Sequence, residues 1–114
     1  MPGRVAIFLS HADDTSLRLA GACAMTAAAM GDRVDVFLFG PALAALRDAS
    51  GDDGDAASLL GQARSHGAVR LIACSASLVE ARIDLADAER SFDAVVGWPT
   101  IIEWSRGVVD RFSF

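Results

Sequence analysis

The chain has 114 residues, 53% of them hydrophobic, which is enough for one packed domain and too few for two. The formal net charge is −5 and all ten Lys/Arg positions are arginine, so the composition argues against a nucleic-acid partner and excludes Schiff-base or P-loop chemistry. No apolar stretch reaches the ~20 residues of a membrane span or the ~7–15 of a secretory signal. We expect one domain, residues 1–114, in the cytoplasm and without membrane contact.

The first half of the chain is predicted to form two strand–helix units. A continuous apolar run near the N-terminus is typical of a strand that is buried on both faces. Asp13 and Asp14 then supply the acidic start of an alanine-rich helix, and Gly31 stands where a glycine cap would end it. The predicted elements are a strand at 4–9, a helix at 13–31, a strand at 32–40, a helix at 41–49 and a polar loop at 50–57.

The second half of the chain repeats the same alternation. Ser77 and Glu80 have the spacing of a capping box, which predicts a helix N-cap at Ser77. Thr100 and Glu103 repeat that spacing later in the chain. The predicted elements are a helix at 57–67, a strand at 68–73, a helix that starts at 77, a helical turn at 84–91, a strand at 92–97, a helix at 98–107 and a final strand at 108–114.

This alternation of elements predicts the fold class. Apolar strands separated by helices are typical of stacked βαβ units. We therefore expect an α/β fold with three layers, α/β/α, around a mostly parallel sheet of about five strands, as in flavodoxin-like proteins. In such open sheets, ligands and reacting groups gather at the carboxyl ends of the strands.

Cys74 is the residue on which the functional interpretation depends. It follows the third predicted strand, just before a helix start, where free backbone N–H groups and the helix dipole favour a nucleophilic thiolate. The alternative is a buried cysteine that only packs. Ser75 and Ser77 are candidates to donate hydrogen bonds to a sulfur anion, or else serve as turn and cap residues. Cys23, in the middle of the alanine-rich helix, is predicted to pack as a small apolar residue.

Four stretches of the sequence resemble a known family. They are "RVAIFL", "GDRVDVFLFG", "VRLIACSAS" and "VVGWPTIIEWSRGVVDRFSF", and together they span almost the whole chain. They look like the DsrE/DsrF-like family, small α/β proteins of sulfur relay. The resemblance implies a single DsrE-like domain that forms a homo-oligomer (dimer, trimer or hexamer). It also implies that the cysteine after the third strand, here Cys74, carries a persulfide sulfur between donor and acceptor proteins or small thiols, with no metal or organic cofactor.

The segment after the first strand allows further interpretations. His11, Asp13 and Asp14 are similar to the H-x-D-D motif with which LmbE-like deacetylases bind zinc, and His66 is the only other histidine that the chain offers as a ligand. Alternatively, this segment borders the Cys74 site, because we expect the first and third strands to be close neighbours. A solvated loop with an acidic helix start is the remaining possibility.

Three functions therefore stay open. The first is a sulfur carrier or sulfurtransferase that acts through Cys74. The second is a non-catalytic module that binds a small ligand or a protein partner at the same rim of the sheet. Trp98 is a candidate for that rim, with a subunit contact or core packing as its alternatives. The third is a zinc-dependent deacetylase.

Overall fold

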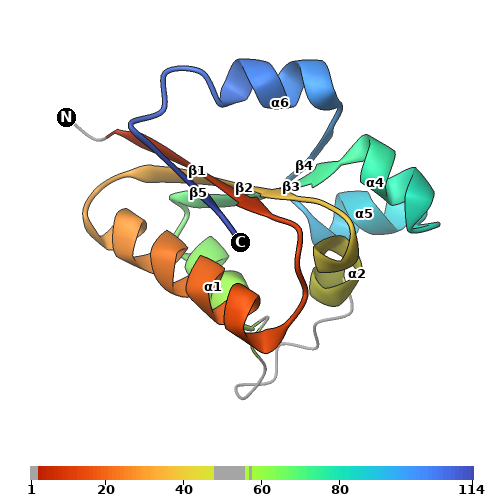
Figure 1. Ribbon diagram of the computed structural model, residues 1–114, viewed down its shortest axis with the longest axis horizontal. Coiled ribbons are helices and arrows are strands. Elements are labelled where there is room, and N and C mark those ends of the chain that lie inside the picture. Colours follow the sequence, from red (N-terminus) through yellow and green to blue (C-terminus); the bar gives the residue numbers. More distant parts are fainter. Residues whose placement is uncertain (1–2, 48–55, 57) are drawn as a thin grey trace.

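The computed structural model describes residues 3–47, 56 and 58–114, with alternating strands and helices as the sequence predicts (Figure 1). The strands are β1 (Arg4–Leu9), β2 (Arg33–Leu38), β3 (Val69–Cys74), β4 (Ala94–Val96) and β5 (Asp110–Ser113). The helices are α1 (Asp14–Ala29), α2 (Pro41–Arg47), α3 (Ser58–Ser65), α4 (Ser75–Glu80), α5 (Leu85–Ser91) and α6 (Trp98–Trp104). Apart from residue 56, the loop predicted at 50–57 lies outside the described residues, as do residues 48 and 49 of the helix predicted before it.

The five strands form one parallel sheet in the order β4-β3-β2-β1-β5. The first three connections each move the chain one place in the same direction, and the last returns it to the free edge of β1. Because crossovers between parallel strands are right-handed, this reversal places the last helix on the opposite face of the sheet. Figure 1 shows α6 alone on one face and α1, α2, α3 and α5 on the other. The predicted three-layer α/β/α fold is confirmed.

The strand order corrects one expectation of the sequence analysis. The first and third strands are not neighbours, because β2 lies between them and pairs with both. The physical reason is that α1 carries the chain only to the adjacent position beside β1, and β3 then adds to the free edge of β2. Segments that follow β1 and β3 are therefore separated by the width of a strand.

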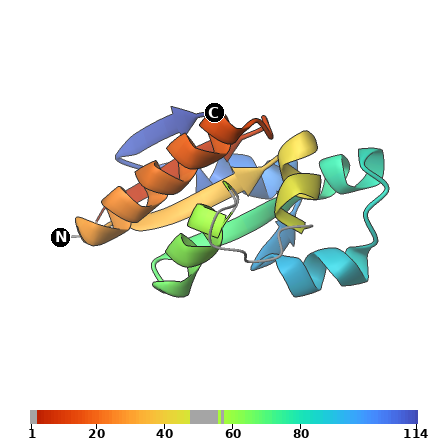
Figure 2. The same ribbon diagram turned by 90° about the horizontal axis from the view of Figure 1, so that it is seen from below.

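Alternating side chains of the strands supply two apolar cores. Ile7 and Val36 belong to the larger core, under the helices that spread across the near face in Figure 2. Phe37 and Ile72 point to the opposite face, where Ile101 of α6 packs on them. The short helix α6 covers this face of the sheet, and the core beneath it is correspondingly small.

The longest helix, α1, begins and ends as the sequence predicts. Asp13 is its N-cap, and the Asp13 carboxylate accepts a hydrogen bond from the backbone N–H of Ser16 at 3.0 Å. At the other end, Gly31 follows the C-cap with a φ of +93°, a conformation that glycine adopts most easily. Within the described part of the chain, no helix, α1 included, is both long and apolar enough to cross a bilayer.

The N-cap predicted at Ser77 is wrong, and Thr100, which repeats the capping-box spacing, is not an N-cap either. Helix α4 starts at Ser75, with Cys74 at the N-cap position, and α6 starts at Trp98, with Gly97 as N-cap. In both places the strand runs almost directly into the helix, so the turn is made by the last strand residues rather than by the serine or threonine further on. Pro99 suits the first turn of α6, where its missing N–H costs no hydrogen bond.

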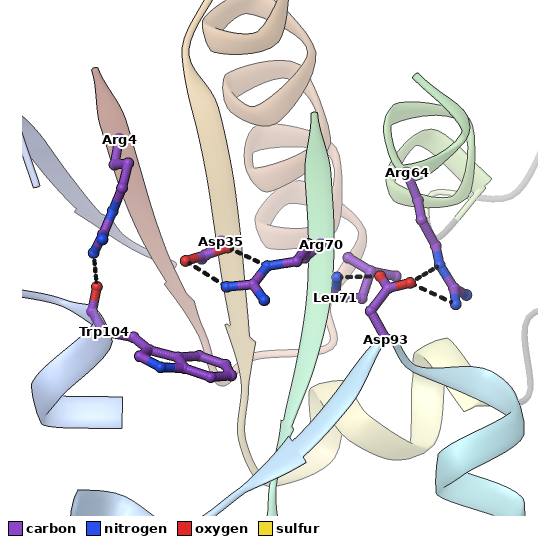
Figure 3. Close-up of polar contacts among 7 residues, drawn as sticks. All are labelled: Arg4, Asp35, Arg64, Arg70, Leu71, Asp93 and Trp104. Carbon is purple, nitrogen blue, oxygen red and sulfur yellow. Dashed lines mark hydrogen bonds and ion pairs between the residues drawn. The ribbon is translucent and has the colours of Figure 1, made fainter. Parts of the chain in front are cut away.

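A side chain holds the short edge strand β4 in place (Figure 3). The Asp93 carboxylate accepts a hydrogen bond from the backbone N–H of Leu71 at 2.7 Å, and the Asp93 N–H donates to the Leu71 carbonyl oxygen at 2.8 Å. Arg64 of α3 pairs with the same carboxylate at 3.0 Å. These contacts fix the start of β4, and with it the path of the chain towards α6.

Candidate functional site

Cys74 lies at the carboxyl end of β3, as the sequence predicts, and is the N-cap residue of α4. Its side chain points to the α6 face and packs with Phe37, Ile72 and Ile101. Only 1% of Cys74 is exposed, and it makes no side-chain capping hydrogen bond to α4. The cysteine therefore has the expected position in the sheet but lies beneath α6 in the single chain.

The starts of α4 and α6 come together beside this cysteine. Cys74 is aligned with Val96 in the β3–β4 pair, so the two strands end side by side. The Ser75 hydroxyl faces Gly97, where a Cβ atom added to the glycine would lie 3.6 Å from the Ser75 Oγ. Of the residues named from the sequence, Cys74, Ser75 and Trp98 thus share one corner of the sheet.

Trp98 closes this corner as the end of a row of stacked aromatic rings. The ring of Trp98 lies 5.2 Å from that of Phe39, with an angle of 19° between their planes. Phe39 in turn stacks on Phe8, and Phe8 on Phe37, at 6.3 and 5.3 Å. Trp98 itself is 51% exposed, so one part of its side chain faces solvent at the rim while its ring stacks on Phe39. Ser77, by contrast, is buried within α4.

His11, Asp13 and Asp14 lie elsewhere. They are exposed, they follow β1, and they lead into α1 on the face of the sheet opposite to the Cys74 side chain. Hydrogen bonds from the hydroxyl and the backbone N–H of Ser16 lower the pKa of Asp13, so this carboxylate already serves as a helix cap. Among residues 3–47, 56 and 58–114, no three His, Cys, Asp or Glu side chains are grouped to hold a metal ion.

Cys23 is a second thiol in a different environment. It lies half-buried in α1, beside the edge strand β5. Burial raises the pKa of the Cys23 thiol, and the negative charge of Asp110 raises it further. Cys23 is therefore a weak nucleophile, which makes it a suitable internal reference for Cys74.

A polar hollow at the other end of the sheet is the feature that the sequence analysis missed. It is a space of about 330 Å³ at the amino ends of the strands, under the last turn of α6. It is lined by Arg4, Arg33, Asp35, Arg70 and Trp104, and we call it the basic pocket. Figure 3 shows these side chains except that of Arg33. The signal in the sequence was the alternation of charged and apolar residues at the start of β2, which indicates that one side of the strand is open to solvent.

Comparisons with known proteins identify the family and the fold of this chain. The family model described as "DsrE/DsrF-like family" matches residues 3–106. No curated protein matches the chain significantly. A solved structure of a protein of unknown function, MTH1491 from Methanobacterium thermoautotrophicum, is 25% identical with a TM-score of 0.70, and the alignment covers 96% of this chain and 98% of that one.

Two further solved structures share the fold at lower identity. The ychN protein from E. coli is 16% identical with a TM-score of 0.73, over 98% of this chain and 99% of that one. A conserved protein of unknown function, BT1422 from Bacteroides thetaiotaomicron, is 12% identical with a TM-score of 0.76, over 98% and 95% of the two chains. At these identities the two structures show a shared fold over nearly the whole chain.

Proposed function

This chain belongs to the DsrE/DsrF-like family, and on that premise we propose that it is a sulfur carrier whose Cys74 holds a persulfide. The observation that carries the proposal is the position of Cys74, at the carboxyl end of a central parallel strand. Reacting groups gather at this edge of open α/β sheets. The family as a whole is associated with sulfur relay, and the resemblance implies that Cys74 takes the place of its sulfur-carrying cysteine.

The transfer needs only thiol chemistry. The Cys74 thiolate attacks the terminal sulfur of a donor persulfide, R–S–SH, so that the new Cys74–S–SH bond forms as the donor S–S bond breaks and R–S⁻ leaves. In the second half-reaction, an acceptor thiolate attacks the same terminal sulfur and the Cys74 thiolate is released. No electrons are gained or lost overall, and neither a metal nor an organic cofactor takes part. Donor and acceptor are proteins or small thiols in a reducing compartment such as the cytoplasm.

Exchange at Cys74 requires its cover to open. Ile101 packs over the cysteine, and α6 carries both Ile101 and Trp98. Because α6 is a seven-residue helix and alone on its face, we propose that its first turn moves outward to admit a small thiol. The stacking of Trp98 on Phe39 would hold this turn closed.

The test is loading with inorganic polysulfide followed by peptide mass analysis. We expect the Cys74 peptide to gain about 32 Da, the mass of one sulfur atom, and the Cys23 peptide to stay unchanged. Cys23→Ser is the matched control and should load as the wild type does, whereas Cys74→Ser should not load. A native protein in which neither cysteine gains sulfur would contradict the carrier function.

A non-catalytic binding module is the second candidate, and the burial of Cys74 favours it. In that case the cysteine is core packing, and the same rim, with Trp98 exposed, binds a small ligand or a protein. This candidate predicts that Cys74→Ala leaves ligand binding intact and lowers only the stability of the fold.

Large apolar side chains are also exposed along the α6 side, namely Trp98, Ile102 and Val109. We propose that copies of a homo-oligomer contact one another through this side.

A further inference from the structure

The basic pocket concentrates positive charge that its own lining does not balance. It holds the side chains of Arg4, Arg33 and Arg70 and one carboxylate, that of Asp35. Three guanidinium groups and one carboxylate leave a formal charge of +2 in a hollow of about 330 Å³, although the whole chain carries −5. A cationic hollow on an acidic protein is unusual and points to an anionic ligand.

The sheet register brings two of these arginines together. Arg4 and Arg33 are directly aligned in the parallel β1–β2 pair, and both line the pocket. Like charges in directly opposed positions destabilise a sheet. Arg4 donates hydrogen bonds to the backbone carbonyls of Trp104 and Arg106, which orient its guanidinium but leave its charge in place. The backbone N–H of Arg33 donates to the Gly3 carbonyl oxygen at 3.0 Å, but the Arg33 guanidinium has no hydrogen-bond or ion-pair partner among the described residues.

Arg70 forms the fixed wall of the pocket. The Arg70 Nε and Nη2 atoms donate to the two carboxylate oxygens of Asp35 at 2.9 and 3.2 Å. The same guanidinium lies over the Trp104 ring, 4.7 Å from its centre (Figure 3). The two contacts hold Arg70 in one orientation, so a ligand meets a group that is already positioned.

We propose that the basic pocket binds a small tetrahedral dianion, such as inorganic phosphate, sulfate or thiosulfate. The ligand charge matches the unbalanced +2 of the pocket. Arginine forks recognise such oxyanions by paired, charge-assisted hydrogen bonds, and Arg33 is free to supply one fork. The hollow is open to solvent and exceeds a single oxyanion in volume, so water fills the remainder. The pocket lies at the opposite end of the sheet from Cys74, so the proposal does not depend on the sulfur-carrier function.

The two tryptophans of α6 provide the direct test. Trp104 lines the pocket, whereas Trp98 lies at the far end of the same helix. In ¹⁵N-labelled wild-type protein, titration with sodium sulfate or phosphate should shift the indole signal of Trp104 saturably and leave that of Trp98 in place. Sodium chloride at equal ionic strength should shift neither. The proposal is overturned if the dianions shift neither indole signal, or if chloride shifts the Trp104 signal equally.

Two arginine variants show whether the pocket itself is responsible. Arg33→Gln should weaken sulfate binding about tenfold, which corresponds to about 1.4 kcal/mol and to the loss of one charge-assisted hydrogen bond. Arg18→Gln is the matched control, since Arg18 is exposed on α1 and changes the net charge equally. An equal loss of sulfate affinity in both variants would show that sulfate is attracted only by the overall charge of the protein, and it would refute a specific site in the basic pocket. If Arg33→Gln fails to fold, Arg4→Gln takes its place. The titration of the wild type tests the proposal without either variant.

Discussion

Asp13 shows how a single side chain can both start a helix and make stability depend on pH. Its carboxylate accepts hydrogen bonds from the hydroxyl and the backbone N–H of Ser16, at 2.8 and 3.0 Å, and these lower its pKa below the ordinary 3.8. Because the folded state favours the charged form, the contribution of Asp13 to stability is complete above the ordinary pKa. It is lost as the pH falls through the lowered value.

The prediction is a pH-dependent effect of Asp13→Ala. The variant should melt below the wild type at pH 6, and the difference in Tm should shrink as the pH falls below the ordinary pKa of 3.8. Asp13→Asn keeps a capping oxygen without the charge, so its advantage over alanine should stay constant across that range. Thermal unfolding followed by circular dichroism measures all three proteins. A wild-type advantage that is flat between pH 3 and pH 6 would contradict the assignment.

At the scale of elements, the packing of α1 on α3 depends on one glycine. A Cβ atom at Gly21 would lie 2.6 Å from the Cβ of Leu59, closer than side chains pack. Gly21→Ala should therefore destabilise the fold by about 1–3 kcal/mol, despite the better helix propensity of alanine. Gly61→Ala in α3 is the matched control, because nothing lies within 4 Å of its added Cβ and it should stabilise slightly. Urea unfolding separates the two; a stable Gly21→Ala protein would refute the close contact.

Helix α6 is the element on which access to Cys74 depends. If stacking of Trp98 on Phe39 holds its first turn closed, then Trp98→Ala should raise the rate at which iodoacetamide labels native Cys74. Labelling of Cys23, in α1 on the other face, serves as the control and should keep its wild-type rate. Unchanged Cys74 labelling would mean that the sulfur is reached by another route. A matched rise at both cysteines would mean that the whole fold is loosened.

For the whole molecule, local sequence patterns were enough to predict the fold. The surroundings of the candidate site depend on contacts between residues that are distant in the sequence, and local patterns do not show these. Apolar runs, acidic helix starts and glycine ends were enough to predict a mostly parallel sheet of about five strands, the Asp13 start and the Gly31 end of α1. The position of Cys74 at a strand end was predicted too, but its burial was not, because the residue that covers it, Ile101 of α6, is distant in the sequence. The order of strands cannot be derived from local pattern, so of the alternatives left open for His11 the one beside that cysteine was wrong, and the exposed loop with an acidic helix start agrees with the structure.

The basic pocket escaped the sequence analysis for the same reason. Arg4, Arg33 and Arg70 are far apart along the chain, and they meet only because the strand register aligns Arg4 with Arg33 and Asp35 with Arg70. Taken singly, each is an ordinary surface arginine at a strand start. The molecule therefore has two separate candidate sites on the α6 face of its sheet, a thiol at the carboxyl end and a cationic hollow at the amino end.

The measurement that tests the central claim most directly is the amount of sulfur that Cys74 releases to cyanide after loading. Protein treated with polysulfide and freed of excess reagent is mixed with cyanide, which attacks the terminal sulfur of a persulfide and leaves as thiocyanate while the Cys74 thiolate is regenerated. The sulfur-carrier account predicts one thiocyanate per chain from the wild type and from Cys23→Ser, and none from Cys74→Ser. Equal release from Cys74→Ser and the wild type, or no release from any of the three, would contradict it.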